Sequence, residues 1–132
     1  MNRVSVENIT TAADSVSIAV ASAAVVYTKA FDLSYGAYFA LAYKAVSATG
    51  SPSIKIELEQ SWILPTTEGA ADANWVVPEG ATATEADLTT ETQHLKALSP
   101  VTMPFGRLKI TGSGTNPADT IVTAKISQQQ QF

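Results

Sequence analysis

The stretch FGRLKITGSGTNPADTIVTAKI, residues 105–126, decides the fold class of this chain. Apolar and polar residues alternate along both of its halves, and a segment rich in Gly, Ser, Asn and Pro separates them. The residues expected to face inward are Leu108, Ile110, Thr120, Val122, Ala124 and Ile126. Alternation with a period of two is typical of a half-buried β-strand. The stretch therefore predicts a β-hairpin with one face toward a core and the other toward solvent or a partner.

A strand with the same period is predicted for residues 54–62. One face would carry Ile54, Ile56, Leu58, Gln60 and Trp62, and the other would carry Lys55, Glu57, Glu59 and Ser61. A register shift of one residue would bury three charged side chains, so the sequence specifies this register strongly. Trp75 begins another short extended segment. We expect Trp62 and Trp75 to pack in the core, because each ring buries a large apolar area.

The length of 132 residues fits one domain with its own core. Strand-like segments recur at intervals of about 8–12 residues with turn residues between them, as in sandwiches and barrels. Residues 37–47 would tolerate a helix, but their aromatic and β-branched residues favour a strand. We therefore expect an all-β, single-domain antiparallel β-sandwich over residues 1–132, with a jelly roll as one arrangement. A short N-terminal arm, about residues 1–9, and a polar C-terminal tail, about residues 128–132, would form its ends.

Composition excludes several classes of function. The chain has no cysteine, so it has no disulfides, thiolate catalysis or cysteine-based zinc sites. Its net charge of −4 argues against direct nucleic-acid binding, which requires clustered Lys and Arg. Charged residues make up only 15% of the chain, whereas about 25% is usual in soluble domains. A surface so poor in charge is suited to burial against other protein copies.

An apolar run at residues 16–27 raises the question of a membrane segment. The run is shorter than the roughly 20 apolar residues that a membrane-spanning helix requires. Acidic Glu7 and Asp14 precede it, where a secretory signal would carry positive charge. We expect neither a membrane span nor a signal peptide, and we interpret the run as buried strands.

No pattern of catalytic residues is recognisable. His94 is the only histidine, and no motif places a nucleophile or an orienting partner beside it. Gly112-Ser113-Gly114 lacks the Lys-Ser/Thr of a phosphate-binding loop and is better interpreted as a turn. The acidic residues of the central loops lack the spacing of a calcium site; they are Glu68, Asp72, Glu79, Glu85 and Asp87. The sequence thus predicts a protein that is not an enzyme, with no catalytic residues, no cofactor and no metal.

The two chain ends are the predicted partner-binding segments. Val4 and Val6 lie on one side of the N-terminal arm, which could add a strand to the exposed edge of a neighbouring subunit. At the other end, Gln129 and Gln130 could extend such a ladder, and Phe132 could dock in a pocket of the partner.

Several blocks of the sequence resemble small virion proteins of tailed bacteriophages. They are SYGAY at residues 34–38, PSIKIELE at 52–59, WVVPEG at 75–80, RLKITG at 107–112 and NPADT at 116–120. The resemblance implies a structural virion subunit, either a capsid decoration or cement protein or an auxiliary head or neck component. Its partners would be the major capsid protein or neighbouring head or neck subunits, and copies of itself. Its location would be the virion, assembled in the host cytoplasm.

Three other functions stay open on the sequence. A carbohydrate- or receptor-binding module would expose Trp62 or Trp75 together with Tyr35 or Tyr38 in a groove. An extracellular filament subunit would exchange a terminal strand with its neighbour. An enzyme would place His94 in a cleft beside acidic residues.

Overall fold

In a computed structural model the chain folds into β-strands joined by turns and loops. The structure describes residues 2–34, 36, 38–47, 53–79, 84–87, 93–98, 101–113, 116–117 and 119–131. The strands in these ranges are β1 (Asn2–Ile9), β2 (Ile18–Ala19), β3 (Val25–Tyr27), β4 (Phe31–Asp32), β5 (Tyr38–Val46), β6 (Ser53–Ser61), β7 (Thr84–Asp87), β8 (His94–Ala97), β9 (Phe105–Gly112) and β10 (Ile121–Gln131).

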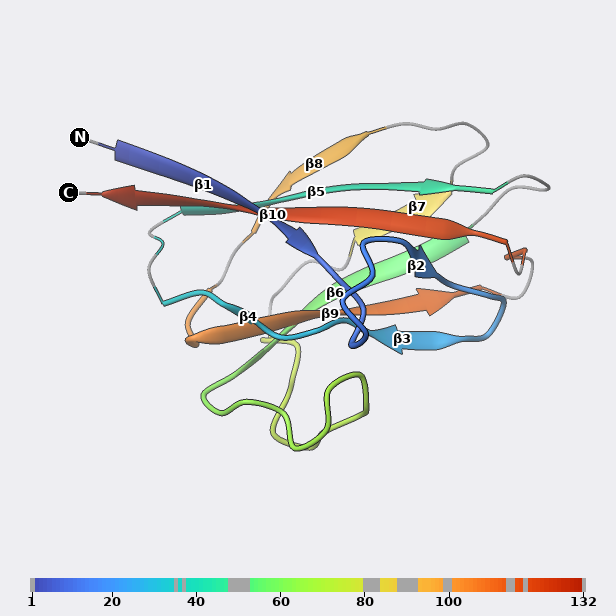
Figure 1. Ribbon diagram of the computed structural model, residues 1–132, viewed down its shortest axis with the longest axis horizontal. Coiled ribbons are helices and arrows are strands. Elements are labelled where there is room, and N and C mark those ends of the chain that lie inside the picture. The colour runs from blue at the N-terminus through green and yellow to red at the C-terminus, as the bar shows by residue number, and fades with distance from the viewer. Residues whose placement is uncertain are drawn as a thin grey trace.

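The strands form two sheets packed as layers (Figure 1). Sheet A has the order β1-β10-β5-β8 with β2 also paired to β10, and sheet B has the order β3-β9-β6-β7 with β4 also paired to β9. All pairings are antiparallel, and they are nested along the chain: β6 with β7, β5 with β8, β3 and β4 with β9, β1 and β2 with β10. This connectivity, a long hairpin rolled across two sheets, is jelly-roll-like. The predicted all-β antiparallel sandwich is confirmed.

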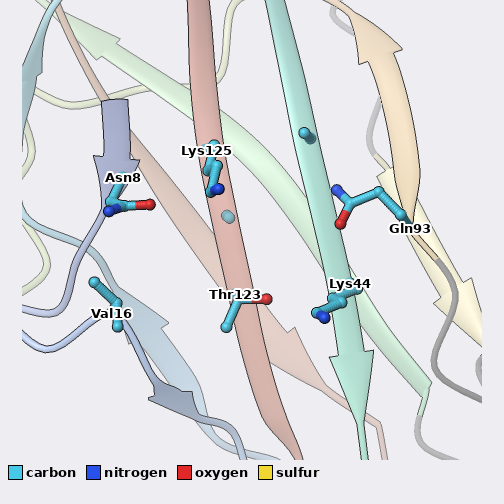
Figure 2. A pocket seen from close by; sticks show the side chains of 8 residues that line it. Asn8, Val16, Lys44, Gln93, Thr123 and Lys125 are labelled. Carbon is cyan, nitrogen blue, oxygen red and sulfur yellow. The ribbon is translucent and has the colours of Figure 1, made fainter. Parts of the chain in front are cut away.

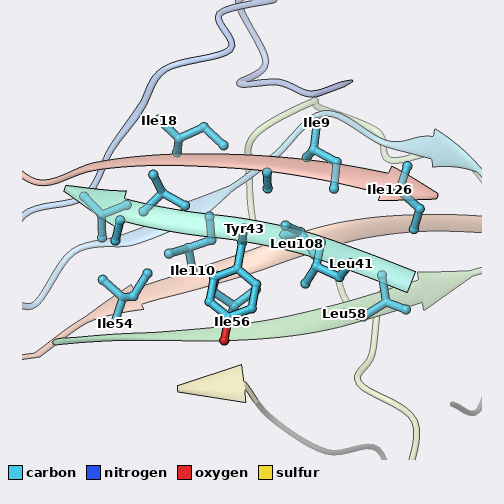
Figure 3. Packing of buried hydrophobic residues seen from close by; sticks show 14 of the residues in the cluster. Ile9, Ile18, Leu41, Tyr43, Ile54, Ile56, Leu58, Leu108, Ile110 and Ile126 are labelled. Atoms are coloured by element: carbon cyan, nitrogen blue, oxygen red, sulfur yellow. The ribbon is translucent and has the colours of Figure 1, made fainter. Parts of the chain in front are cut away.

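The hydrophobic core lies between the two sheets (Figure 3). Both layers contribute alternate residues, because successive side chains of a strand point to opposite faces. The core includes Ile9, Leu41, Tyr43, Ala45, Val122, Ala124 and Ile126 from sheet A and Ile54, Ile56, Leu58, Leu108 and Ile110 from sheet B. The inward faces predicted for residues 54–58, 108–110 and 122–126 are therefore correct.

The prediction of a hairpin at residues 105–126 is wrong. β9 belongs to sheet B and β10 to sheet A, so the two strands face each other across the core instead of pairing. The end of β9 lies tightly against the segment after β2 at this corner between the sheets, since a Cβ at Gly112 would overlap the carbonyl oxygen of Ala21. Alternation reports which side chains are buried, and a hairpin and a corner between sheets produce the same alternation.

Asn116 holds this corner together from a buried position. Its Nδ2 donates to the carbonyl oxygen of Val20 at 2.7 Å, and its Oδ1 accepts from the Ser53 amide at 3.1 Å and the Thr120 hydroxyl at 3.3 Å. The side chain thus links the start of β6 and the entry to β10 with the segment after β2. A residue that sequence analysis assigns to a surface turn is a buried polar anchor.

The two tryptophans occupy different environments, and neither belongs to the core between the sheets. Trp62 follows β6 and is 65% exposed, so its predicted core position is wrong. The inward face of β6 ends instead at Gln60, whose Oε1 accepts from the amides of Thr102 and Met103. Trp75 is buried as expected, at 3% exposure, but its ring lies against the guanidinium group of Arg107 on the outer side of sheet B.

Replacement of Asn116 by alanine tests the corner. We expect Asn116→Ala to lower the free energy of unfolding by about 1–3 kcal/mol, because buried backbone groups lose their hydrogen-bond partner. Asn8→Ala, at an exposed position of β1, is the matched control and should stay within about 0.5 kcal/mol of the unmodified chain. Urea unfolding followed by circular dichroism measures both, and equal losses would contradict the anchoring role.

Candidate interaction surface

The two ends of the chain pair with each other. β1 and β10 form an antiparallel ladder that runs from Asn2 opposite Gln131 to Ile9 opposite Ala124, and the termini lie side by side (Figure 1). Gln128 is buried, and its Nε2 donates to the carbonyl oxygen of Asp32 at 2.8 Å. The structure thus pairs the segment expected as an N-terminal arm with the segment expected as a polar C-terminal tail. Glutamines fit this strand because the ladder hydrogen bonds come from the main chain, whatever the side chain.

This ladder brings most of the predicted partner-binding residues together. Val4 lies opposite Gln129, and Gln130 lies opposite Arg3. Val6 lies opposite Ser127 on the same face as Val4. Phe132 lies outside the described residues, so its predicted docking role stays a prediction. What sequence analysis treats as two independent arms is a single two-stranded surface.

β1 is one of the two outer strands of sheet A, and β8 is the other. The second edge of β1 has no strand partner within the described ranges, so main-chain donors and acceptors face outward there. The side chains from Arg3 to Asn8 are exposed on both faces, and Val4 and Val6 are 60% and 62% exposed. Only Ile9, at the end of the strand, enters the core. An ordered strand with an open edge and exposed apolar side chains is suited to strand addition.

A shallow concavity of about 540 Å³ lies on the outer face of sheet A (Figure 2). It is lined by Asn8, Val16, Ala42, Lys44, Gln93, Thr123, Ala124 and Lys125. Its lining, as far as the chain is described, contains two lysines and no carboxylate.

A buried arginine lies on the outer side of sheet B. Arg107 is fully buried; its Nε donates to Glu59 at 2.9 Å and its Nη1 to the carbonyl oxygen of Ala70 at 2.8 Å. Its guanidinium carbon lies 4.4 Å from the ring centroid of Tyr27 and 5.0 Å from that of Trp75, within cation–π range. Arg107 Nη2 and Trp75 Nε1 are buried without a hydrogen-bond partner among the described residues. The cluster fastens the segment that follows β6 onto the sheet.

This Arg107 cluster is inaccessible, but the segment that it fastens exposes apolar side chains. Trp62, Ile63 and Leu64 are all about half exposed or more, as is Val76 beside them in a β-bridge to Gln60. The alternation of residues predicts outward positions for Arg107 and Glu59, but both side chains are buried. The presence of a tryptophan in a long Ala- and Gly-bearing loop was the only sequence signal that this loop folds back.

His94 begins β8 and lies opposite Tyr43 of β5. Its ring stacks on Tyr43 with 5.0 Å between ring centroids, and burial raises the pKa of the Tyr43 hydroxyl. His94 Nε2 is buried without a hydrogen-bond partner in the described ranges. The same part of the chain contains no group of three or more side chains of the metal-binding type. It also contains no helix long and apolar enough to span a bilayer.

Comparison with known proteins gives no match to a family model, to a curated protein or to a solved structure. Function must therefore be argued from the surfaces of this chain.

Replacement of Arg107 by methionine tests the buried cluster. We expect Arg107→Met to lower the free energy of unfolding by about 3–5 kcal/mol at pH 7, because the Glu59 carboxylate stays buried without its cation. Burial raises the pKa of Glu59, and the hydrogen bond and charge of Arg107 oppose that rise. Without Arg107 the folded-state pKa rises further. A carboxyl with a raised folded-state pKa contributes its stability at low pH and loses it as the pH rises through that pKa.

The loss in Arg107→Met should accordingly shrink as the pH falls from 7 toward about 4.3, the unfolded-state pKa of Glu. The double variant Arg107→Met with Glu59→Gln is the control, since it removes both charges and should recover part of the stability at pH 7. Urea unfolding at several pH values measures these effects. A penalty for Arg107→Met that does not depend on pH would show that the ion pair is not what stabilises the cluster.

Proposed function

We propose that this protein is a structural subunit that assembles with other subunits through the open edge of β1. The proposed setting is the virion of a tailed bacteriophage, with the chain acting as a capsid decoration or cement protein or as an auxiliary head component. Its neighbours there would be the major capsid protein or adjacent head or neck subunits, together with copies of itself. The observation that carries the proposal is an exposed, ordered edge strand with an apolar pair, Val4 and Val6.

Two further features support an assembly role. Few residues of the chain are charged, and the segment after β6 exposes Trp62, Ile63 and Leu64, which suits contact with other proteins. Jelly-roll connectivity is shared by viral capsid and lectin domains, which is an analogy of fold and does not fix function. The assignment to a phage virion rests on the sequence resemblance.

Pre-ordering of β1 makes this edge a better contact than a free arm. Ordering a disordered arm costs roughly 1–2 kcal/mol per residue in backbone entropy. β1 is already held by its ladder with β10, so an added strand meets a formed template and loses less entropy on binding. The same ladder keeps the side chains of Val4 and Val6 available, since it involves the main chain.

Lysine substitution at the edge tests the assembly role. We expect Val4→Lys with Val6→Lys to weaken association at least tenfold, since charges on an edge strand oppose strand addition. The free energy of unfolding should change by no more than about 1 kcal/mol, because both positions are exposed. Val25→Lys on β3, an outer strand of sheet B with Val25 46% exposed, is the matched control. Co-sedimentation with assembled particles measures association, and equal binding by both variants would contradict the proposal.

The virion setting has its own test. The unmodified protein should band with intact particles in a density gradient and be detected there by mass spectrometry. Recovery only at the top of the gradient, apart from the particles, would contradict the virion assignment.

A carbohydrate-binding module is the second candidate, because Trp62 is exposed as that function requires. Trp75 cannot serve, since only 3% of it is exposed. Tyr35 lies outside the described residues, and Tyr38 is exposed at the start of β5. Soluble glycans should then change the fluorescence of the native chain and leave that of Trp62→Ala unchanged. An unchanged native spectrum across a glycan panel would remove this candidate.

A further inference from the structure

The sequence of β1 is nearly the same in both directions around Ser5. Residues 2–8 read NRVSVEN, with Asn at both ends and Val on either side of Ser5. The one asymmetric pair, Arg3 and Glu7, consists of opposite charges. A strand of this kind is complementary to its own reverse, which is the requirement of an isologous two-fold contact.

Antiparallel pairing of β1 with a second β1 would use this symmetry in full. If the two-fold axis passes through Ser5, Arg3 lies opposite Glu7 of the second copy, and Val4 lies opposite Val6 of the second copy. Directly opposed residues share a face of the sheet and interact as a cross-strand pair. The pairing therefore forms two charge pairs on one face and two valine pairs on the other.

Other registers lose these pairs. A parallel arrangement in the same register would place each Arg3 opposite the other Arg3. A shift by one residue would place the valines opposite polar residues, and a shift by two would leave Arg3 and Glu7 opposite neutral residues. Because like charges directly opposite one another are destabilising, the charges select one orientation and one register.

Among the described residues, Arg3 and Glu7 have no partner of opposite charge. Arg3 lies opposite Gln130, and Glu7 lies opposite Ile126. Both side chains are exposed, and neither forms an ion pair with the described residues. The charges of Arg3 and Glu7 are thus available at the open edge of β1, where no described strand pairs.

We propose that the open edge of β1 binds β1 of a second copy of this chain, antiparallel and centred on Ser5, so that sheet A continues across the two copies. The inference deepens the proposed function, because it rests on β1 as the assembly contact and names the occupant of that edge. It does not depend on the virion setting. One strand pair buries less area than the roughly 1,200 Å² of a stable interface, so the isolated dimer is weak and depends on concentration.

Disulfide trapping tests the register, because the native chain contains no cysteine. In Ser5→Cys the two introduced thiols face each other across the axis, within the Cα separation of about 4.4–6.8 Å that a disulfide requires. Mild oxidation should convert this variant to a covalent dimer. Asn8→Cys is the matched control on the same exposed strand; its thiols would lie about 20 Å apart, so it should stay largely monomeric.

Charge exchange tests the pairing without a cross-link. Arg3→Glu and Glu7→Arg each place like charges opposite one another in a homodimer, and each should weaken self-association about tenfold. A mixture of the two variants restores both opposite-charge pairs in the heterodimer. Sedimentation velocity should therefore show association in the mixture comparable to that of the unmodified chain, while each variant alone stays dissociated.

The outcomes separate this inference from the proposed function. Cross-linking of Ser5→Cys but not Asn8→Cys, with recovery in the charge mixture, supports the pairing. Failure of Ser5→Cys to cross-link, or a mixture no better than its components, overturns it. If it fails while Val4→Lys with Val6→Lys still abolishes binding to particles, the edge binds a different protein and the proposed function stands. If pairing succeeds while those lysine substitutions leave particle binding intact, the proposed function falls and the pairing stands.

Discussion

The assembly of sheet A depends on β10, which lies between β1 and β5. β10 pairs with β5 on one side and with β1 and β2 on the other, and its alternate residues Val122, Ala124 and Ile126 enter the core. The nested connectivity of the fold is completed only when this last strand joins the first. The pairing therefore closes the roll and leaves β1 at one edge of sheet A.

Only the last residue of β1 packs in the core, and main-chain pairing alone orders the residues before it. Ile9 opposite Ala124 fixes its register through the core, whereas the residues before it are exposed on both faces. Main-chain hydrogen bonds to β10 order residues 3–8, and the side chains of these residues take no part in packing the sandwich. Side chains without a role in the fold are available to a partner. The complementarity of Arg3 and Glu7 about Ser5 supports the proposed pairing of β1 with a second copy.

Sequence patterns predicted the burial of strand faces but not their partners. Ile54, Ile56 and Leu58 face inward as expected, because period-two alternation arises directly from strand geometry. The hairpin at residues 105–126 was wrong, because alternation does not specify whether neighbouring strands share a sheet. Arg107 and Glu59 were expected at the surface. Their burial results from a distant loop that carries Trp75 and folds over them, and local periodicity holds no information about such a contact.

The surroundings of the proposed partner-binding residues were only partly predictable for the same reason. Val4 and Val6 were identified from their alternation, and they are exposed. Their pairing opposite the glutamine segment could not be predicted, because main-chain hydrogen bonds form with any side chain and impose no pattern on a polar sequence. Amide hydrogen exchange of β1 measured against protein concentration tests the account most directly. In the dilute protein, we expect pairing with β10 to protect alternate β1 amides from exchange. As copies of the chain associate, we expect the remaining β1 amides to gain protection. Rapid exchange of every β1 amide at all concentrations would contradict it.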